Sequence, residues 1–390
     1  MKQKILLFVF FLLLFTPFIL IAKNNINILN NKELKETPKI VIEPPKTPKP
    51  VPLPYEKILL SKMTNEEKVG QLFIWGVEGT SQLTPENKEF LNLRKAGGVV
   101  LMQGNITDEN QLRTLIKDIQ STNHIPLFIS IDQEGGVVSR LKWNDILTFP
   151  QKSIQTPQNA FEISKQRGIL LKEYGINMNL APVIEYTDND SSFICKRTFS
   201  GSIDEVIEKG IASISGYKEA GIIAVAKHYP GHGNTVVDPH YQLPITDITD
   251  DLWEEYTKVF ERVIKETNLD ALMVGHILFP KIDSYPATLS KTIIQEKLIS
   301  TENFNGLIIS DDMEMNALDG LGSPTEVAER ALQAGCDILI YGKFTPDNRY
   351  HQQVVYDHIL SLVNQNLLNI DDKVLKILQI KLKYGVINRE

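Results

Sequence analysis

The stretch that decides the fold is Ile222–His240, which reads IIAVAKHYPGHGNTVVDPH. It begins with an uninterrupted apolar run, turns polar at Lys227 and His228, and continues as a segment rich in glycine and proline. A short continuous apolar run of this kind predicts a strand that is covered on both faces. Glycine and proline then predict a structured loop directly after the strand. The polar side chains are therefore expected where a buried strand meets a loop.

Seven other apolar runs share this character, and amphipathic stretches separate them. The eight predicted strands are 71–77, 97–102, 127–132, 176–183, 222–228, 271–277, 307–313 and 337–342. The clearest amphipathic stretches are Asp108–Ser121, Asp204–Ala220, Asp251–Thr267 and Pro324–Ala334. Eight strand–helix units in succession predict an α/β fold, a single (β/α)8 TIM-like barrel. No G-x-G-x-x-G follows the first run, which argues against a dinucleotide-binding fold.

Polar residues stand at or just past the ends of the predicted strands. They are Asp132, Lys227, His228, His276 and Asp311. One polar residue after a strand is commonly the cap of the next helix. Five of them point to a shared function, because the carboxyl ends of barrel strands form one rim and active sites lie there. We expect the functional site at this rim.

The loop within 226–240 contains a pair that suits proton transfer. Asp238 and His240 are two residues apart, so the carboxylate can accept from one imidazole nitrogen and fix the tautomer. The other nitrogen then gives or takes a proton near neutral pH. A helix cap beside an unrelated histidine is the alternative. Pro230 and Gly231 argue against a metal site, because they interrupt the helical turn that would aim the rings of His228 and His232 at one ion.

Asp311 is the candidate nucleophile. It ends the buried run LIIS at the rim, where neighbouring cations can keep a carboxylate ionised. Asp312 points to the other side of the chain and is expected to cap the following segment. The two aspartates could exchange these roles.

Four motifs together resemble the family 3 glycoside hydrolases, and within that family the β-N-acetylglucosaminidases. The strongest is K-H-[FY]-P-G-H-G-x4-D-x-H, present as Lys227–Gly233 followed by Asp238-Pro239-His240. The others are D-Q-E-G-G at Asp132–Gly136 with Arg140 downstream, S-D-D-M at Ser310–Met313, and K-R-T-F at Lys196–Phe199. The resemblance extends from about Tyr55 to about Gly342.

The resemblance implies a retaining exo-glycosidase that removes terminal β-linked GlcNAc by double displacement. We expect no metal or other cofactor. Asp311 matches the nucleophile, and His240 supported by Asp238 matches the general acid and base. The positions that match those binding the hydroxyls and acetamide of the terminal sugar are Asp132, Arg140, Arg197, Lys227 and His228. Glu134 is a second carboxylate in the D-Q-E-G-G motif, for which we expect a structural role.

The chain departs from the family pattern in three places. Val137 stands where an arginine often follows E-G-G, Pro239 replaces the usual serine of D-S-H, and Asn234 replaces a small or acidic residue. Proline is expected to stiffen the loop. Some members carry a further α/β domain after the barrel. Here the residues after Gly342 predict helices, with Asn364–Lys383 the clearest, so all catalytic groups are expected from the barrel.

The N-terminus predicts export. Lys2 and Lys4 precede an apolar run from Ile5 to Ala22, so residues 1–22 are interpreted as a signal peptide or membrane anchor. Residues 23–54, rich in proline and lysine, predict an unfolded linker, and 55–390 the barrel domain. The chain is thus expected to be secreted, or tethered to the membrane through residues 5–22, with substrates such as peptidoglycan fragments or chitin-type oligosaccharides.

Composition and charge exclude some classes of protein function, and others stay open. The chain has 390 residues and a net charge of -7, with no long basic run, so nucleic-acid binding is not expected. Cys195 and Cys336 predict two free buried thiols, with a single bridge as the alternative. Other functions that stay open are a β-glucosidase or β-xylosidase, a phosphorylase that uses GlcNAc glycosides, and a non-enzymatic carbohydrate-binding barrel at the cell surface.

Overall fold

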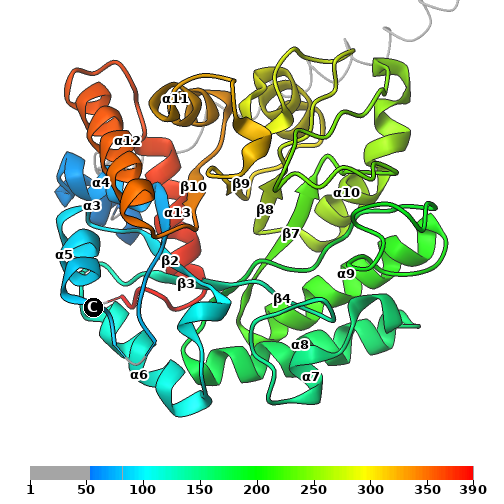
Figure 1. Cartoon of the computed structure of the whole chain (residues 1–390), viewed down its shortest axis with the longest axis horizontal. Coiled ribbons are helices and arrows are strands. Elements are labelled where there is room, and N and C mark those ends of the chain that lie inside the picture. Colours follow the sequence, from blue (N-terminus) through cyan, green and yellow to red (C-terminus); the bar gives the residue numbers. More distant parts are fainter. Residues whose placement is uncertain (1–52, 81, 390) are drawn as a thin grey trace, which may run out of the picture. The chain divides into compact units, whose positions relative to one another are not determined.

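The computed structural model describes residues 53–80 and 82–389, which fold around a closed barrel of eight parallel strands (Figure 1). The barrel strands are β1 (Phe73–Gly76), β2 (Gly98–Leu101), β3 (Phe128–Ile131), β6 (Met178–Asn179), β7 (Ile223–Tyr229), β8 (Ala271–Val274), β9 (Leu307–Asp312) and β10 (Ile338–Tyr341). Each strand pairs with the next in this order, and Leu339 of β10 pairs with Phe73 of β1 to close the ring. The predicted (β/α)8 barrel is confirmed: seven predicted strand regions each contain a barrel strand, and the region 222–228 overlaps β7, which extends to Tyr229.

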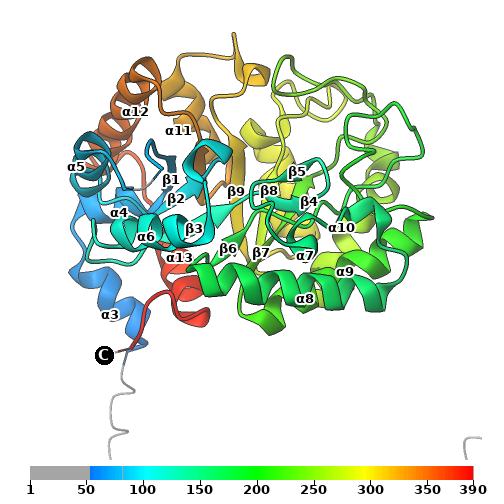
Figure 2. The ribbon, with the colours of Figure 1, turned by 60° about the horizontal axis from the view of Figure 1, so that its bottom comes forward.

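A helical segment follows each barrel strand. These segments are α5 (Pro85–Leu93), α6 (Glu109–Gln120), α8 (Pro157–Tyr174), α9 (Ile203–Ala220), α10 (Trp253–Thr267), the π-helical segment Thr292–Thr301, α11 (Pro324–Ala334) and α12 (Pro346–Asn364). Local sequence explains several boundaries: Ser202 and Ser323 form capping boxes at the starts of α9 and α11. Gly175 and Gly221 end α8 and α9 in the left-handed conformation. Figure 2 shows α8 and α9 side by side.

The remaining elements are short or lie near the ends of the described chain. They are α3 (Tyr55–Lys62), α4 (Asn65–Gln71), α7 (Asp145–Thr148), α13 (Asp371–Lys383) and an antiparallel hairpin of β4 (Gln133–Gly135) and β5 (Val138–Ser139). The sequence did not predict the hairpin. The helices predicted after Gly342 are α12 and α13, and the stretch Asn364–Lys383 contains the whole of α13.

The strands are buried on both faces, as their apolar sequences predict. Phe73, Ile129, Val225 and Leu272 are each 0% exposed. This burial explains why the runs are continuously apolar instead of alternating. The two cysteines are both buried and unpaired, as expected.

The two ends of the barrel differ. At the N-terminal end of the strands, Lys381 of α13 is fully buried, and its ammonium donates to the Gln71 side chain and the carbonyls of Gly97 and Pro126 at 2.6–2.9 Å. Lys381 and its partners thus fill the N-terminal end of the barrel, and the functional site is expected at the opposite end, where the loops are longer. The predicted signal or anchor, residues 1–22, and nearly all of the linker, residues 23–54, lie outside the described residues. In the described part of the chain, no helix has the length and apolar character needed to cross a membrane.

Candidate functional site

All of the predicted site residues lie at the C-terminal end of the barrel. They come from strand ends and from the loops that follow: Asp132 after β3, Arg140 after β5, Arg197 in the loop after β6, Lys227 and His228 in β7, Asp238 and His240 in the loop after β7, and Asp311 in β9.

Five charged side chains meet at this end and form what we call the charge cluster: Asp132, Glu134, Arg140, Arg197 and Lys227. The Lys227 Nζ lies 2.7 Å from Asp132 Oδ1 and 2.7 Å from Glu134 Oε1. Arg197 binds both oxygens of Glu134, at 2.7 and 3.0 Å. Arg140 Nη2 lies 3.3 Å from Asp132 Oδ2. The structure thus brings four predicted sugar-binding residues together and adds Glu134.

The charges of the cluster stabilise one another. Burial by itself would raise the pKa of Asp132 and Glu134, but Lys227 and the two arginines outweigh it; the pKa of Glu134 falls to about 2. Burial would likewise lower the pKa of Lys227, but the two carboxylates hold it above its usual value. These groups therefore stay ionised at neutral pH. They offer fixed donors and acceptors to a polar ligand.

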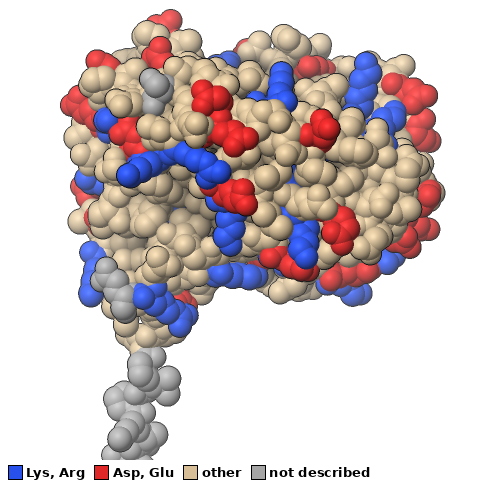
Figure 3. Space-filling view, turned by 90° about the horizontal axis from the view of Figure 1, so that it is seen from below, with Lys and Arg blue, Asp and Glu red and all other residues tan. Residues whose placement is uncertain are grey.

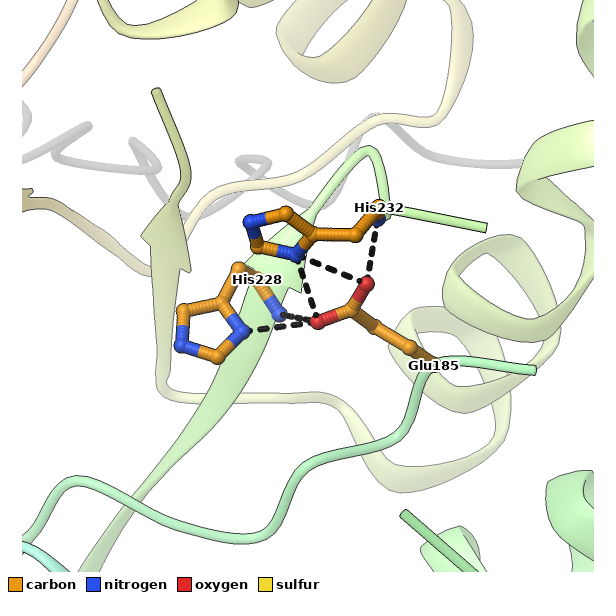
Figure 4. A group of neighbouring side chains, drawn as sticks. All are labelled: Glu185, His228 and His232. Carbon is orange, nitrogen blue, oxygen red and sulfur yellow. Dashed lines mark hydrogen bonds and ion pairs between the residues drawn. The ribbon is translucent and has the colours of Figure 1, made fainter. Parts of the chain in front are cut away.

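Glu185 is a buried carboxylate that the sequence analysis missed. It lies in the loop after β6. Its oxygens accept hydrogen bonds from the backbone N–H and the ring Nδ1 of both His228 and His232 (Figure 4). The Nδ1 distances are 2.7 Å from His228 and 3.1 Å from His232. Burial would raise the pKa of Glu185, but the rings of His232 and His228 lower it well below its usual value. The sequence feature that could have identified Glu185 is its position as a carboxylate two residues past the predicted strand 176–183.

The same three residues bear on metal binding. The prediction that Pro230 and Gly231 keep the rings of His228 and His232 from facing one point is wrong: one nitrogen of each ring and a Glu185 oxygen lie within 4.8 Å of one another. A carboxylate has about four acceptor sites, and four N–H groups already occupy those of Glu185. A metal ion would have to displace them, so the geometry fits a hydrogen-bonded network better than a metal site.

The network fixes the tautomer of His228. Arg197 Nη2, which can only donate, lies 3.3 Å from His228 Nε2. Nε2 must therefore accept, and Nδ1 carries the proton that Glu185 receives. Burial lowers the pKa of His228, and the Arg197 charge adds to this effect, while Glu185 opposes it. The imidazole is neutral at neutral pH, and the network holds its orientation.

Asp311 and Asp312 are neighbours with opposite pKa shifts. Burial would raise the pKa of Asp311, but the imidazoles of His228 and His276, the backbone N–H of Asp312 and Lys227 outweigh it, so the pKa falls. Burial and Glu314 raise the pKa of Asp312 to about 7. Asp312 Oδ1 accepts from the backbone N–H of Glu314, at 3.0 Å, which is the capping role that the sequence predicts. Asp311 is therefore the ionised member of the pair.

Asp238 and His240 form the predicted pair on the loop after β7. His240 Nδ1 lies 2.7 Å from Asp238 Oδ1, and the backbone N–H of His240 donates to the same oxygen at 2.9 Å. The side chains are 60% and 34% exposed for His240 and Asp238. The preceding Pro239 carbonyl accepts from the backbone N–H of Ala317, six residues past Asp311. The loop with the pair therefore contacts the segment that follows the candidate nucleophile.

Features away from the rim do not compete with this site. A cavity of about 810 Å³ lies on the outer flank, between α10 and the segment 292–306, and none of the predicted site residues lines it. On the face shown in Figure 3, acidic and basic side chains are interspersed. That face therefore presents no field of a single sign to a charged polymer.

Comparison with known families decides the assignment. Residues 64–380 match the model described as "Glycosyl hydrolase family 3 N terminal domain". The chain belongs to glycosyl hydrolase family 3. This family 3 chain is a glycoside hydrolase enzyme, and the resemblance stated from its motifs is confirmed.

Individual relatives point the same way. A beta-hexosaminidase from Photobacterium profundum is 35% identical over 267 residues, which cover 66% of this chain and 78% of the relative. The structure of a glycoside hydrolase family 3 beta-N-acetylglucosaminidase from Paenibacillus sp. str. FPU-7 matches with a TM-score of 0.77 at 29% identity; the match covers 83% of this chain but 63% of that one. Zinc-bound CbsA from Thermotoga neapolitana matches with a TM-score of 0.73 at 28% identity, covering 83% of this chain and 69% of that one.

Proposed function

We propose that this family 3 hydrolase is a retaining exo-β-N-acetylglucosaminidase. The observation that carries the proposal is the combination of an ionised, partly buried Asp311 near the end of β9 with the His240–Asp238 pair on a loop that contacts the segment after Asp311. Relatives named beta-hexosaminidase and beta-N-acetylglucosaminidase support the choice of sugar.

The proposed reaction has two steps. In the first, an Asp311 oxygen attacks the anomeric carbon, while protonated His240 gives its Nε2 proton to the departing oxygen. In the second, a water molecule loses a proton to His240 Nε2 and displaces Asp311. Asp238 holds the Nδ1 proton throughout and so fixes the direction of Nε2. Because the general acid is a histidine, the site does not place a second catalytic carboxylate beside Asp311, and so avoids repulsion between two negative charges.

We assign binding of the terminal sugar to Asp132, Arg140, Arg197, Lys227 and His228. The carboxylate of Asp132 can accept from adjacent hydroxyls, and the cations donate to hydroxyl and acetamide oxygens. One relative is described as zinc-bound. The saturated oxygens of Glu185 do not fit such an ion, so no step here uses a metal.

We also propose that the enzyme acts outside the cytoplasm, on peptidoglycan fragments or chitin-type oligosaccharides, after export through residues 1–22. Cell fractionation tests the location. Recovery of the protein in the cytosol alone would contradict export while leaving the chemistry untouched.

The chemistry is tested with 4-nitrophenyl β-glycosides of GlcNAc, glucose and xylose, each with and without EDTA. We expect turnover of the GlcNAc substrate, unaffected by EDTA. Preference for glucose or xylose would contradict the assigned sugar. Turnover that requires added phosphate would make the enzyme a phosphorylase.

The nucleophile is tested with Asp311→Asn. We expect a loss of kcat on the order of 10⁴-fold or more, because no covalent intermediate can form. Acid quenching of the wild-type enzyme during turnover, followed by peptide mapping, should place the glycosyl ester on Asp311. An ester on Asp312 would exchange the roles of the two aspartates.

A further inference from the structure

The loop that carries His240 is tied to the loop after β6 by one residue, Asn234. Thr187 Oγ1 donates to Asn234 Oδ1 at 2.7 Å, and Asn234 Nδ2 donates to Asp188 Oδ1 at 2.6 Å. Asn189 Nδ2 donates to the backbone carbonyl of Asn234 at 3.0 Å. Asn234 is thus the centre of a clamp between segments about 45 residues apart in the sequence.

Neighbouring residues extend this clamp. Ser192 Oγ donates to the carbonyl of Gly233 at 2.8 Å, and the backbone N–H of Phe193 donates to the carbonyl of Thr235 at 3.0 Å. The Phe193 ring lies 6.4 Å from the ring of His240, and the Arg197 guanidinium lies 5.2 Å from the centre of the Phe193 ring. The segment that supplies Arg197 to the charge cluster therefore also supports the loop of His240.

A second anchor lies on the other side, next to His240. Pro239 is buried, and its carbonyl accepts from the backbone N–H of Ala317 at 3.2 Å. Ala317 belongs to the 3-10 turn Asn316–Leu318, which follows Asp311 in sequence. The Asp238 carbonyl accepts from the backbone N–H groups of Tyr241 and Gln242, so the residues around His240 form a compact turn.

The loop needs such contacts because the His240 side chain is exposed, so packing does not fix its position. His240 is 60% exposed, and its one side-chain hydrogen bond among the described residues is to Asp238 on the same loop. A general acid must stay within hydrogen-bond reach of the departing oxygen. Asn234 and Pro239 are also the two positions in this loop at which the chain departs from the family motif.

We propose that Asn234 and Pro239 are positioning residues that hold His240 toward Asp311 before substrate binds. Asn234 ties the loop to the sugar-binding side of the rim, and Pro239 ties it to the nucleophile side. The inference rests on the proposed function, in which His240 is the general acid and base. It predicts that loss of the Asn234 side chain impairs proton transfer and leaves sugar binding intact.

The test compares two β-GlcNAc substrates in the full chain. One has 2,4-dinitrophenol as leaving group, which departs without protonation; the other is the GlcNAc-β-1,4-GlcNAc disaccharide, whose leaving group needs a proton. For Asn234→Ala we expect kcat/KM on the disaccharide to fall about 3–10-fold, since two hydrogen bonds are lost, with kcat/KM on the dinitrophenyl substrate unchanged. Azide, which needs no general base, should restore any loss of kcat on the dinitrophenyl substrate.

Two further variants sharpen the test. Thr187→Val removes the hydroxyl that donates to Asn234 Oδ1, so its effect should be non-additive with that of Asn234→Ala. Gln242→Ala is the matched control: Gln242 is exposed on the same loop, and in the described residues its side chain makes no hydrogen bond. We expect it to retain wild-type values on both substrates.

His240→Ala separates this inference from the function on which it rests. It should lose at least about 100-fold on the disaccharide and little on the dinitrophenyl substrate. Equal losses on both substrates would overturn the proposed role of His240. If His240→Ala shows the difference but Asn234→Ala affects both substrates equally or neither, the positioning role of Asn234 is wrong.

Discussion

The charge cluster and the His240–Asp238 pair lie on the same rim but are held in different ways. In the cluster, the side chains of Lys227 and Glu134 are 2% and 1% exposed and make ion pairs with other strand ends and loops. The side chains of His240 and Asp238 are 60% and 34% exposed, and among the described residues they hydrogen-bond only within their own loop. We infer that the barrel itself fixes the groups assigned to sugar recognition, whereas bonds between loops fix the group assigned to proton transfer.

Removing the central cation gives the largest expected contrast between the two regions. Lys227→Met should lower the free energy of unfolding by about 3 kcal/mol, because the buried Glu134 and the partly buried Asp132 would lose the cation that they share and keep only their arginine partners. Urea denaturation followed by tryptophan fluorescence measures this.

His240→Ala is the control for that measurement. Its side chain is exposed, so we expect the free energy of unfolding to change by less than about 0.5 kcal/mol. A Lys227 variant as stable as wild type, or a His240 variant as unstable as the Lys227 variant, would mean that the two regions do not differ in this way.

Glu185→Gln tests the network behind the cluster. Glutamine keeps the shape of Glu185 but has one acceptor oxygen for the four N–H groups that the carboxylate receives. We expect a loss of about 1–3 kcal/mol in the free energy of unfolding. KM should rise for both the dinitrophenyl and the disaccharide substrate, because His228 loses its orientation. A loss confined to the disaccharide would instead place Glu185 with the acid loop.

Asp312→Asn is expected to give the smallest change in the free energy of unfolding, and that change depends on pH. The folded pKa of Asp312 is raised to about 7, so the folded state favours the protonated form. The resulting stability is fully present below the unfolded pKa of about 3.9 and is lost as pH rises through 7. Between pH 6 and pH 8 this loss should be about 1 kcal/mol in wild type.

The amide that replaces the carboxyl group in this variant does not titrate, so the variant should lack this part of the pH dependence. Thermal unfolding of both proteins from pH 5 to pH 8 is the measurement. Parallel curves for the two proteins would show that Asp312 does not titrate in this range. Asp311, whose pKa is lowered, should contribute no such loss near neutral pH.

The sequence by itself determined the eight strands, the rim and the family. Apolar runs such as 222–228 are buried on both faces, and a parallel barrel is the fold that covers eight of them with intervening helices. Because a strand carries its last residues to the rim, the positions of Asp132, Lys227 and Asp311 followed from the pattern as well. These are local signals, which depend only on neighbouring residues.

Only the tertiary structure decided how distant segments meet. Glu185 joins His228 and His232, and Asn234 joins Thr187, Asp188 and Asn189. The raised pKa of Asp312 also depends on the tertiary structure, because burial is its largest cause. Hydrogen bonds need donor and acceptor within about 3 Å and ion pairs weaken with distance, and sequence spacing does not fix such distances once loops intervene. The sequence therefore places the groups on the rim, and the packing of its loops decides which of them touch.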